Sequence, residues 1–301
     1  MDLTPNAEQL ALVEATADWC RDNMPLEQAR QRPDGLWHQL EQMGWSAMTT
    51  AEIGLDHASE ALVFAELGRH LAPVGLLATA VANRWMADPG KTALALLDRQ
   101  VSGGRMRVFD PAGADRALGL SGSQLACAAL PAGMEGEPGL DLSAPMIHLD
   151  PAPPLEPVGG PLASLHLQLL TASFAVGCAD AARDMAADYA KVREQFDRPI
   201  GWFQALKHIC ADMAVRCAVA RSQLCFAAAS LDGGTSDAAF HVAAAMRLAD
   251  QAAIENGRAN VQVHGGIGMT DEAYPHLCLK RAHLLSFIAP VRRETILGEV
   301  A

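Results

Sequence analysis

The chain has 301 residues, of which 50% are hydrophobic, enough to bury a substantial core in one large domain or in two to three smaller ones. Its formal net charge is -12, and its 23 Lys and Arg residues are spread thinly, which excludes a basic stripe for nucleic acid or for an anionic membrane surface. We therefore expect neither nucleic acid nor a membrane as a partner.

The chain start and the cysteines indicate a reduced, cytoplasmic protein. The start, MDLTPNAEQL, lacks a positive segment followed by an apolar run, which argues against a secretory signal. The longest uncharged run, 157–179, contains Gly, Pro, His and Gln, so it is a poor spanning helix. The 7 cysteines have no paired spacing and are mostly flanked by apolar residues, so we expect core thiols and no metal site.

The first 100 residues are helical in pattern, and we assign 1–100 to an N-terminal helical domain. Capping residues followed by apolar residues at helical spacing mark the helix starts. These starts are predicted at Pro5, Asp34, Ser59 and Pro73.

Glycine and proline break up the segment 101–160, so we expect a small β-rich middle domain there. The best strand candidates are short and bounded by turn formers: GRMRVFD (104–110), QLACAAL (124–130) and PMIHLD (145–150).

The segment 161–301 is predicted to form a C-terminal helical bundle. Its helical runs are rich in Ala and Leu, and their small residues suit close antiparallel packing. The predicted helices are 162–194, 203–231, 236–264 and 274–288.

Between the first two of these runs lies KVREQFDRPIGWFQ (191–204), which carries more than turn formers. One interpretation is structural: Arg193 complements a helix C-terminus, and Phe196 with Phe203 plugs the core. The other is that Arg193 and Gln204 face an anionic or polar ligand while Phe196 covers its flat part, because an arginine fork suits phosphate oxygens.

A second unusual stretch, NVQVHGGIGMTDEAYP (260–275), ends a predicted helix with Gln262 and then presents several glycines. Gly265, Gly266 and Gly268 would let backbone amides approach a ligand closely. The alternative is an ordinary sharp turn between two helices, which also uses glycine.

Together the two stretches resemble a known family. VREQFDRPIGWFQALKHICADMAVRC and VQVHGGIGMTDEAYPHLCLKRAHLL resemble the C-terminal domain of the acyl-CoA dehydrogenases. WHQLEQMGWSAM and FAELGRHLAPVGLLATA resemble that family's opening helical domain. The resemblance covers nearly the whole chain and implies a mainly α fold: an N-terminal helical domain, a reduced β-barrel and a C-terminal four-helix bundle, with FAD at a subunit interface.

The resemblance also implies cofactor-binding residues. By position, one set matches family residues that reach FAD held mainly by the neighbouring subunit, and another matches those that contact the adenosine and pyrophosphate. The first set is Arg193, Phe196 and Gln204, and the second is Gln262, Gly265 and Gly266. Asp197 stands where the family usually has glycine. Aspartate tolerates the turn conformation, but it brings a negative charge near a pyrophosphate.

The family's catalytic glutamate has no counterpart at either expected position. One position falls on Pro290, or on Ala289 with a one-residue gap, and the alternative position falls on Leu167. We therefore expect no catalytic residue in this chain. His166 and Glu294 are weak candidates for a base, because a lone histidine in an apolar helix usually packs in the core and a carboxylate beside arginines usually forms an ion pair.

These features fit the smaller subunit of a heteromeric acyl-CoA dehydrogenase. A larger partner, in a heterodimer or α2β2 heterotetramer, would supply the glutamate and bind the acyl-CoA, with a steroid side-chain CoA as one candidate substrate. The implied reaction is α,β-dehydrogenation, with electrons passing to an electron-transfer flavoprotein. Two alternatives remain open: a non-catalytic structural or regulatory subunit, and a homodimeric dehydrogenase with an unusual base.

Overall fold

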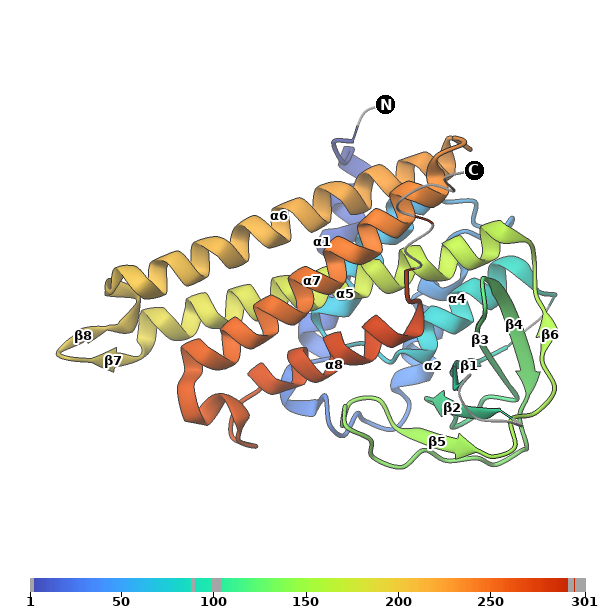
Figure 1. Cartoon of the computed structure of the whole chain (residues 1–301), viewed down its shortest axis with the longest axis horizontal. Coiled ribbons are helices and arrows are strands. Elements are labelled where there is room, and N and C mark those ends of the chain that lie inside the picture. Colours follow the sequence, from blue (N-terminus) through green and yellow to red (C-terminus); the bar gives the residue numbers. More distant parts are fainter. Residues whose placement is uncertain (1–2, 88–89, 99–103, 292–294, 296–301) are drawn as a thin grey trace.

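The computed structural model describes residues 3–87, 90–98, 104–291 and 295, and it is mainly helical with one small sheet (Figure 1). The amino-terminal part is built from helices, with short 3₁₀ helices between them. In chain order they are α1 (Ala7–Asn23), η1 (Leu26–Gln28), α2 (Leu36–Gln42), η2 (Trp45–Ala47), α3 (His57–Arg69) and α4 (Gly75–Trp85).

Each of the predicted helices is present, but the caps differ from those predicted. α1 is capped by Asn6, whose side chain accepts from the backbone of Gln9 while the Gln9 side chain accepts from the backbone of Asn6. α3 is capped by Asp56, which accepts from the backbone N–H of Ser59. Both caps use a side-chain oxygen to satisfy an amide of the first turn. Ser59 is therefore the third residue of its helix, not the first.

The middle of the chain forms one sheet in the order β5-β2-β1-β3-β4-β6. Its strands are β1 (Thr92–Asp98), β2 (Arg105–Phe109), β3 (Arg116–Ser121), β4 (Gln124–Ala129), β5 (Met146–Leu149) and β6 (Glu156–Pro157). β1 runs antiparallel to β2, with Leu94 opposite Phe109, and parallel to β3, with Leu94 opposite Leu118. The three predicted strands contain β2, β5 and β4, so those predictions are confirmed.

The helical prediction for the first 100 residues is wrong over β1. This strand reads TALALLD, a sequence of good helix formers, yet it lies between β2 and β3 at the centre of the sheet. Burial between two neighbouring strands outweighs the helix propensity of these residues, because tertiary packing readily overrides local propensity. The sheet therefore begins ahead of the composition change at 101, and the division into three domains stays a prediction.

The remainder of the chain is a bundle of long helices (Figure 1). These helices are α5 (Pro161–Val192), α6 (Gln204–Asp232), α7 (Ala238–His264) and α8 (Pro275–Ile288). Each bound lies within one or two residues of its predicted position. α5 also packs on α3 and α4, so it joins the bundle to the amino-terminal helices.

Two glycines let α3 and α5 pack closely together. A Cβ atom added at Gly177 would lie 1.9 Å from the carbonyl oxygen of Ala65, and one at Gly68 would lie 2.5 Å from the backbone of Phe174. Contacts this short exclude any side chain, so backbone approach fixes the crossing. By length and composition α5 could cross a membrane, but 83% of its most apolar stretch is buried inside the protein, as in a core helix.

Candidate functional site

A β-hairpin projects from the outer end of the bundle, where the sequence predicts only a tight turn (Figure 1). It consists of β7 (Glu194–Gln195) and β8 (Arg198–Pro199) and is followed by η3 (Ile200–Trp202). The two residues at its tip, Phe196 and Asp197, have φ angles of 56° and 60°. Two consecutive positive φ angles are typical of the hairpin turns that match strand twist. Asp197 thus adopts the conformation expected of it, whereas a phenylalanine there is unusual.

Phe196 points into solvent and does not fill the core. Its side chain is 82% exposed, and its ring meets the ring of Phe203 edge to face, with centroids 6.0 Å apart. The interpretation of Phe196 as a core plug is therefore wrong. An exposed aromatic ring in a strained backbone conformation is a feature found where a ligand or partner makes contact.

Arg193 and Gln204 flank the hairpin, and both are exposed. The backbone N–H of Arg193 bonds to the carbonyl of Tyr189 and ends α5. Neither the Arg193 guanidinium nor the Gln204 amide bonds to a side chain or carbonyl in the part of the chain that the structure describes. Their donors are therefore free for a group outside this chain.

The glycine-rich turn lies at the end of α7. Gly265 has a φ of 67° and ends the helix, and the chain continues as η4 (Gly265–Met269). A Cβ atom at Gly265 or Gly266 would meet nothing within 4 Å, whereas one at Gly268 would lie 3.0 Å from the carbonyl oxygen of Val261. The first two glycines thus leave backbone open to an approaching ligand, and Gly268 serves packing.

A ring contact brings the hairpin and the glycine-rich turn to the same end of the bundle. Tyr189 stacks on His264 with ring centroids 4.0 Å apart and an angle of 21° between the rings. Arg193 lies one turn beyond Tyr189, and Gly265 follows His264 directly. Burial lowers the pKa of His264, while its Nδ1–H, which donates to the carbonyl of Asn260 over 2.9 Å, opposes that shift. The sequence predictions did not include this pair.

The predicted positions for a catalytic base hold no group that could remove a proton. Ala289 and Leu167 are buried, and Pro290 is exposed just after α8. Glu294 lies outside the residues that the structure describes.

His166 is fully buried in a cluster of hydrogen bonds. Its Nδ1 accepts from the indole N–H of Trp85 over 3.1 Å, so the proton lies on Nε2, which donates to Glu60 Oε2 over 2.6 Å. Burial disfavours the charged carboxylate of Glu60, but contact with His166 outweighs it, and the pKa of Glu60 falls to about 2. His57 Nδ1 lies 3.5 Å from the same oxygen.

These three side chains have the composition of a metal site, with ligand atoms within 4.8 Å of one another. However, a metal ion would need the Nε2 lone pair of His166, and the Trp85 donor keeps the proton on that nitrogen. The geometry therefore favours a structural cluster. His57 and Glu60 were not predicted; their H-x-x-E spacing on one helix face is a signal that could have suggested them.

Comparison with known proteins identifies the same family that the two stretches around Arg193 and Gly265 resemble. Residues 6–90 match the model of the acyl-CoA dehydrogenase N-terminal domain, and residues 165–289 match that of the acyl-CoA dehydrogenase C-terminal domain. The acyl-CoA dehydrogenase IpdE2 of Mycobacterium tuberculosis is 33% identical over 271 residues, which cover 83% of this chain and 80% of that protein.

A second relative matches over a shorter region. The acyl-CoA dehydrogenase FadE34 of Mycobacterium tuberculosis is 42% identical over 150 residues, or 48% of this chain, but the match spans only 21% of that longer protein.

Solved structures share the whole architecture. The ChsE4-ChsE5 complex from Mycobacterium tuberculosis contains a chain with a TM-score of 0.74 at 22% identity, covering 95% of this chain and 94% of that one. The steroid acyl-CoA dehydrogenase Tcur3481-Tcur3483, as a G363A variant, gives a TM-score of 0.78 at 21% identity, covering 93% and 92%. At these identities the similarity concerns the fold.

Proposed function

Because the chain belongs to the acyl-CoA dehydrogenase family, an oxidoreductase family acting on acyl-CoA, we propose that it is a subunit that completes a FAD site held mainly by a larger partner. The partner supplies the catalytic glutamate and binds the thioester. The reaction is α,β-dehydrogenation of an acyl-CoA in the cytoplasm, with electrons passing on to an electron-transfer flavoprotein.

One observation carries this proposal: the predicted cofactor-binding residues gather at one end of the bundle and all face outward. Arg193, Phe196, Gln204 and Gln262 are exposed, as are Gly265 and Gly266. Among the residues that the structure describes, none of these polar side chains has a hydrogen-bond partner. Such an arrangement is half of a binding site, because it offers donors and an aromatic face without an enclosing cavity.

The residues present fit FAD. The Arg193 guanidinium suits the pyrophosphate, and the open backbone at Gly265 and Gly266 suits close approach of its oxygens. Gln204 and Gln262 offer amide groups for polar atoms of the cofactor, and the exposed Phe196 ring covers an apolar face. When bound, FAD would accept the hydride from the β carbon, whereas this chain would contribute to binding and orienting the cofactor.

The proton acceptor belongs to the partner in this proposal. A base must lie within hydrogen-bond reach of the α proton, and the family positions hold Pro290, Ala289 and Leu167. His166 is buried, and both of its ring nitrogens are engaged by Trp85 and Glu60. A homodimer that uses His166 as its base would have to break this cluster.

Exposed apolar side chains beside the hairpin support a protein partner. Val192 is 75% exposed and Trp202 63%, and along α6 Val215 is 62% exposed. Exposed apolar side chains of this size would contribute to an interface when a partner covers them. The steroid dehydrogenase among the structures of the same fold makes a steroid-derived acyl-CoA our proposed substrate class.

The test is to purify the chain alone and after co-expression with a candidate larger acyl-CoA dehydrogenase subunit, and to record visible absorption spectra. We expect flavin absorbance only in the co-purified complex. Stoichiometric flavin on the chain alone would overturn the shared site, and absence of flavin from both samples would favour a structural subunit.

The Arg193→Ala change should then weaken FAD binding to the complex by about tenfold to a hundredfold, as expected for one hydrogen bond between charged groups. Arg21→Ala is the matched control, because Arg21 is exposed and, among the residues that the structure describes, pairs only with Asp18. Equal FAD affinity in the two variants would show that Arg193 does not bind FAD.

A further inference from the structure

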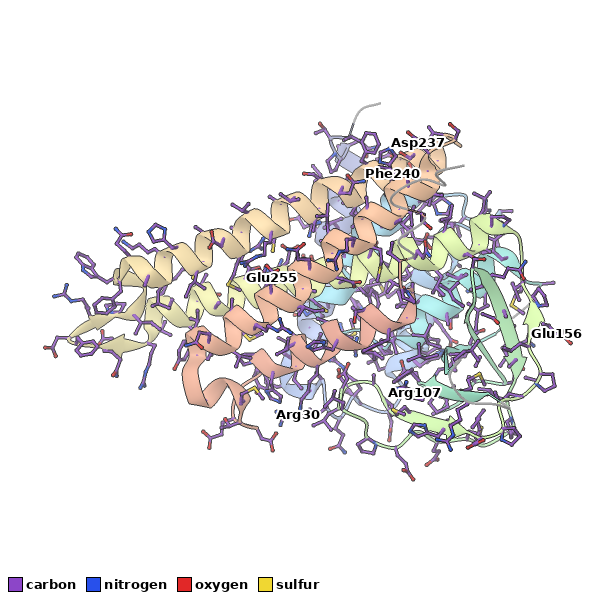
Figure 2. All side chains as sticks on the ribbon, in the orientation of Figure 1. Arg30, Arg107, Glu156, Asp237, Phe240 and Glu255 are labelled. Atoms are coloured by element: carbon purple, nitrogen blue, oxygen red, sulfur yellow. The ribbon has the colours of Figure 1, made fainter. Side chains whose placement is uncertain are left out.

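An arginine from the amino-terminal part reaches the turn that follows the glycine-rich segment. Figure 2 marks Arg30 beside the turn that leads into α8. Arg30 Nη1 lies 3.0 Å from Asp271 Oδ1 and donates to the carbonyl of Asp271 over 3.3 Å. Its Nη2 lies 3.1 Å from His276 Nε2. One guanidinium thus binds two residues on the C-terminal side of the glycines.

His276, the second partner of Arg30, is a buried residue whose ring lies near the glycine-rich turn. It is the second residue of α8 and only 3% exposed. A guanidinium can only donate, so His276 Nε2 accepts and the ring is neutral, with its proton on Nδ1. Nδ1 is buried without a well-formed hydrogen bond, and the carbonyl of Gly268 lies close enough to favour a protonated ring.

We propose that Arg30 and His276 are positioning residues that hold the glycine-rich turn, 265–273, in shape for cofactor binding and release it in acid. This inference rests on the proposed function, since the turn is the part assigned to FAD. The held state requires a neutral His276, because an imidazolium would place a proton against the Arg30 guanidinium.

The charges around His276 set the direction of the pH effect. Burial lowers the pKa of His276 below its ordinary value of 6.5, and the positive charges of Lys280 and Arg30 lower it further, while Asp271 opposes them. A histidine whose pKa is lowered in the folded state stabilises that state above its ordinary pKa. This contribution is lost as the pH falls below 6.5 and through the lowered pKa. The turn is therefore held at neutral pH and loosened in acid.

Arg30 is not needed merely to attach its own segment to the protein. Arg32, two residues on, donates from Nη1 to the carbonyl of Pro25 and from Nη2 to the carbonyls of His70 and Leu71. Those bonds tie the segment to the end of α3 without contacting the glycine-rich turn. The Arg30 contacts are consequently available for positioning the turn.

The experiment is amide hydrogen exchange of the full-length chain at about pH 8 and about pH 4.5, with rates corrected for intrinsic exchange; the lower value is well below the ordinary histidine pKa because the pKa of His276 is lowered. In the natural chain we expect peptides spanning 265–273 to lose about tenfold in protection at the lower pH, the ratio for losing one hydrogen bond to a charged group. Arg30→Met should remove this protection at both pH values.

His276→Gln sharpens the test, because the glutamine carbonyl can accept from Arg30 but cannot be protonated in this range. It should keep protection at the higher pH and abolish the response to acid. Arg21→Met, which removes an arginine paired with exposed Asp18, should behave like the natural chain. Unfolding temperatures identify any variant that fails to fold. If Arg30→Met does not fold, the acid response of His276→Gln alone tests the inference.

Unchanged protection in Arg30→Met, or an unchanged acid response in His276→Gln, would overturn the inference. Titration of the co-expressed complex with FAD separates this failure from failure of the proposed function. We expect Arg30→Met to weaken FAD binding about tenfold. Lost protection with unchanged FAD affinity would support the positioning role and overturn the assignment of the turn to FAD.

Discussion

At the outer end of the bundle, Arg193 exposes a guanidinium that bonds to no residue in the described part of the chain, whereas Arg281 in α8 is fully buried and donates from every nitrogen. Arg281 Nε lies 2.6 Å from Asp141 Oδ2, Nη1 donates to the carbonyl of Ala72 over 2.6 Å, and Nη2 donates to Ser143. A buried charge needs hydrogen-bond partners within the protein, because it has lost its contacts with water. An exposed charge is hydrated and can bind a group from another molecule.

This contrast separates stability from function. Arg281 joins α8 to the loop between β4 and β5 and to Ala72 in the connection between α3 and α4, so three parts of the chain meet at one cation. The hairpin and the glycine-rich turn make few such buried hydrogen bonds and ion pairs. Substitutions in the buried region should therefore change the free energy of unfolding, and substitutions at the outer end should change binding.

The largest effect is expected for Arg281→Met. Removing one partner of a buried ion pair leaves Asp141 charged and uncompensated, which costs about 3–5 kcal/mol of folding free energy. Urea denaturation at neutral pH measures this loss. Arg193→Met is the matched comparison and should change stability by less than about 0.5 kcal/mol, as for exposed positions. Similar losses in the two variants would break the contrast.

A second buried prediction concerns acid. The pKa of Glu60 is lowered to about 2, so its contribution to stability is complete above its ordinary value of 4.5 and is lost as the pH falls toward about 2. The contribution is on the order of 3 kcal/mol, because each tenfold change in an acid dissociation constant is worth about 1.4 kcal/mol. Glu60→Gln should lose this much at neutral pH, and the difference from the natural chain should shrink below pH 4.5.

Free energies of unfolding measured from neutral pH down into this range test the prediction. Parallel curves for the natural chain and Glu60→Gln would show that the carboxylate is not held in its charged form by His166.

At the outer end, Trp202→Ser should leave the chain's own stability nearly unchanged and weaken the complex with the partner. Burial of a large aromatic side chain at an interface contributes about 1–3 kcal/mol, or roughly fivefold to 150-fold in affinity. Leu140→Ser is the control, since Leu140 is 74% exposed in the loop beside the sheet. Sedimentation of the co-expressed complex over a dilution series gives both affinities, and equal values would place the interface elsewhere.

Sequence reasoning succeeded where the signal is local. The bundle helices are Ala- and Leu-rich runs bounded by turn formers, and their bounds were predicted within one or two residues. The Arg193 and Gly265 stretches stand out because they carry more than a turn needs. β1 was missed because its Ala and Leu residues favour a helix until two neighbouring strands enclose them.

The buried clusters could not be predicted in the same way. Glu60 and His166 lie 106 residues apart, and Asp141 and Arg281 lie 140 apart. Nothing in the local sequence indicates that such residues meet, since only the packing of α3, α5 and α8 brings them together. Arg30 and His276, 246 residues apart, belong to the same class. The contacts that support the candidate site were therefore found only in the structure.

Only a small change in stability is expected for Asp197→Gly at the hairpin tip. Glycine relieves the strain of a φ of 60° but adds freedom to the unfolded chain, so the two effects nearly cancel, within about 1 kcal/mol. FAD affinity of the complex should nevertheless rise, because a negative charge is removed from the neighbourhood proposed for the pyrophosphate. Asp197→Asn removes the charge while tolerating the same backbone conformation. If both variants bind FAD more tightly and the gain shrinks with added salt, charge is the cause. A gain in the glycine variant alone would instead assign the effect to the backbone. If neither variant binds FAD more tightly, the hairpin tip does not lie near the pyrophosphate.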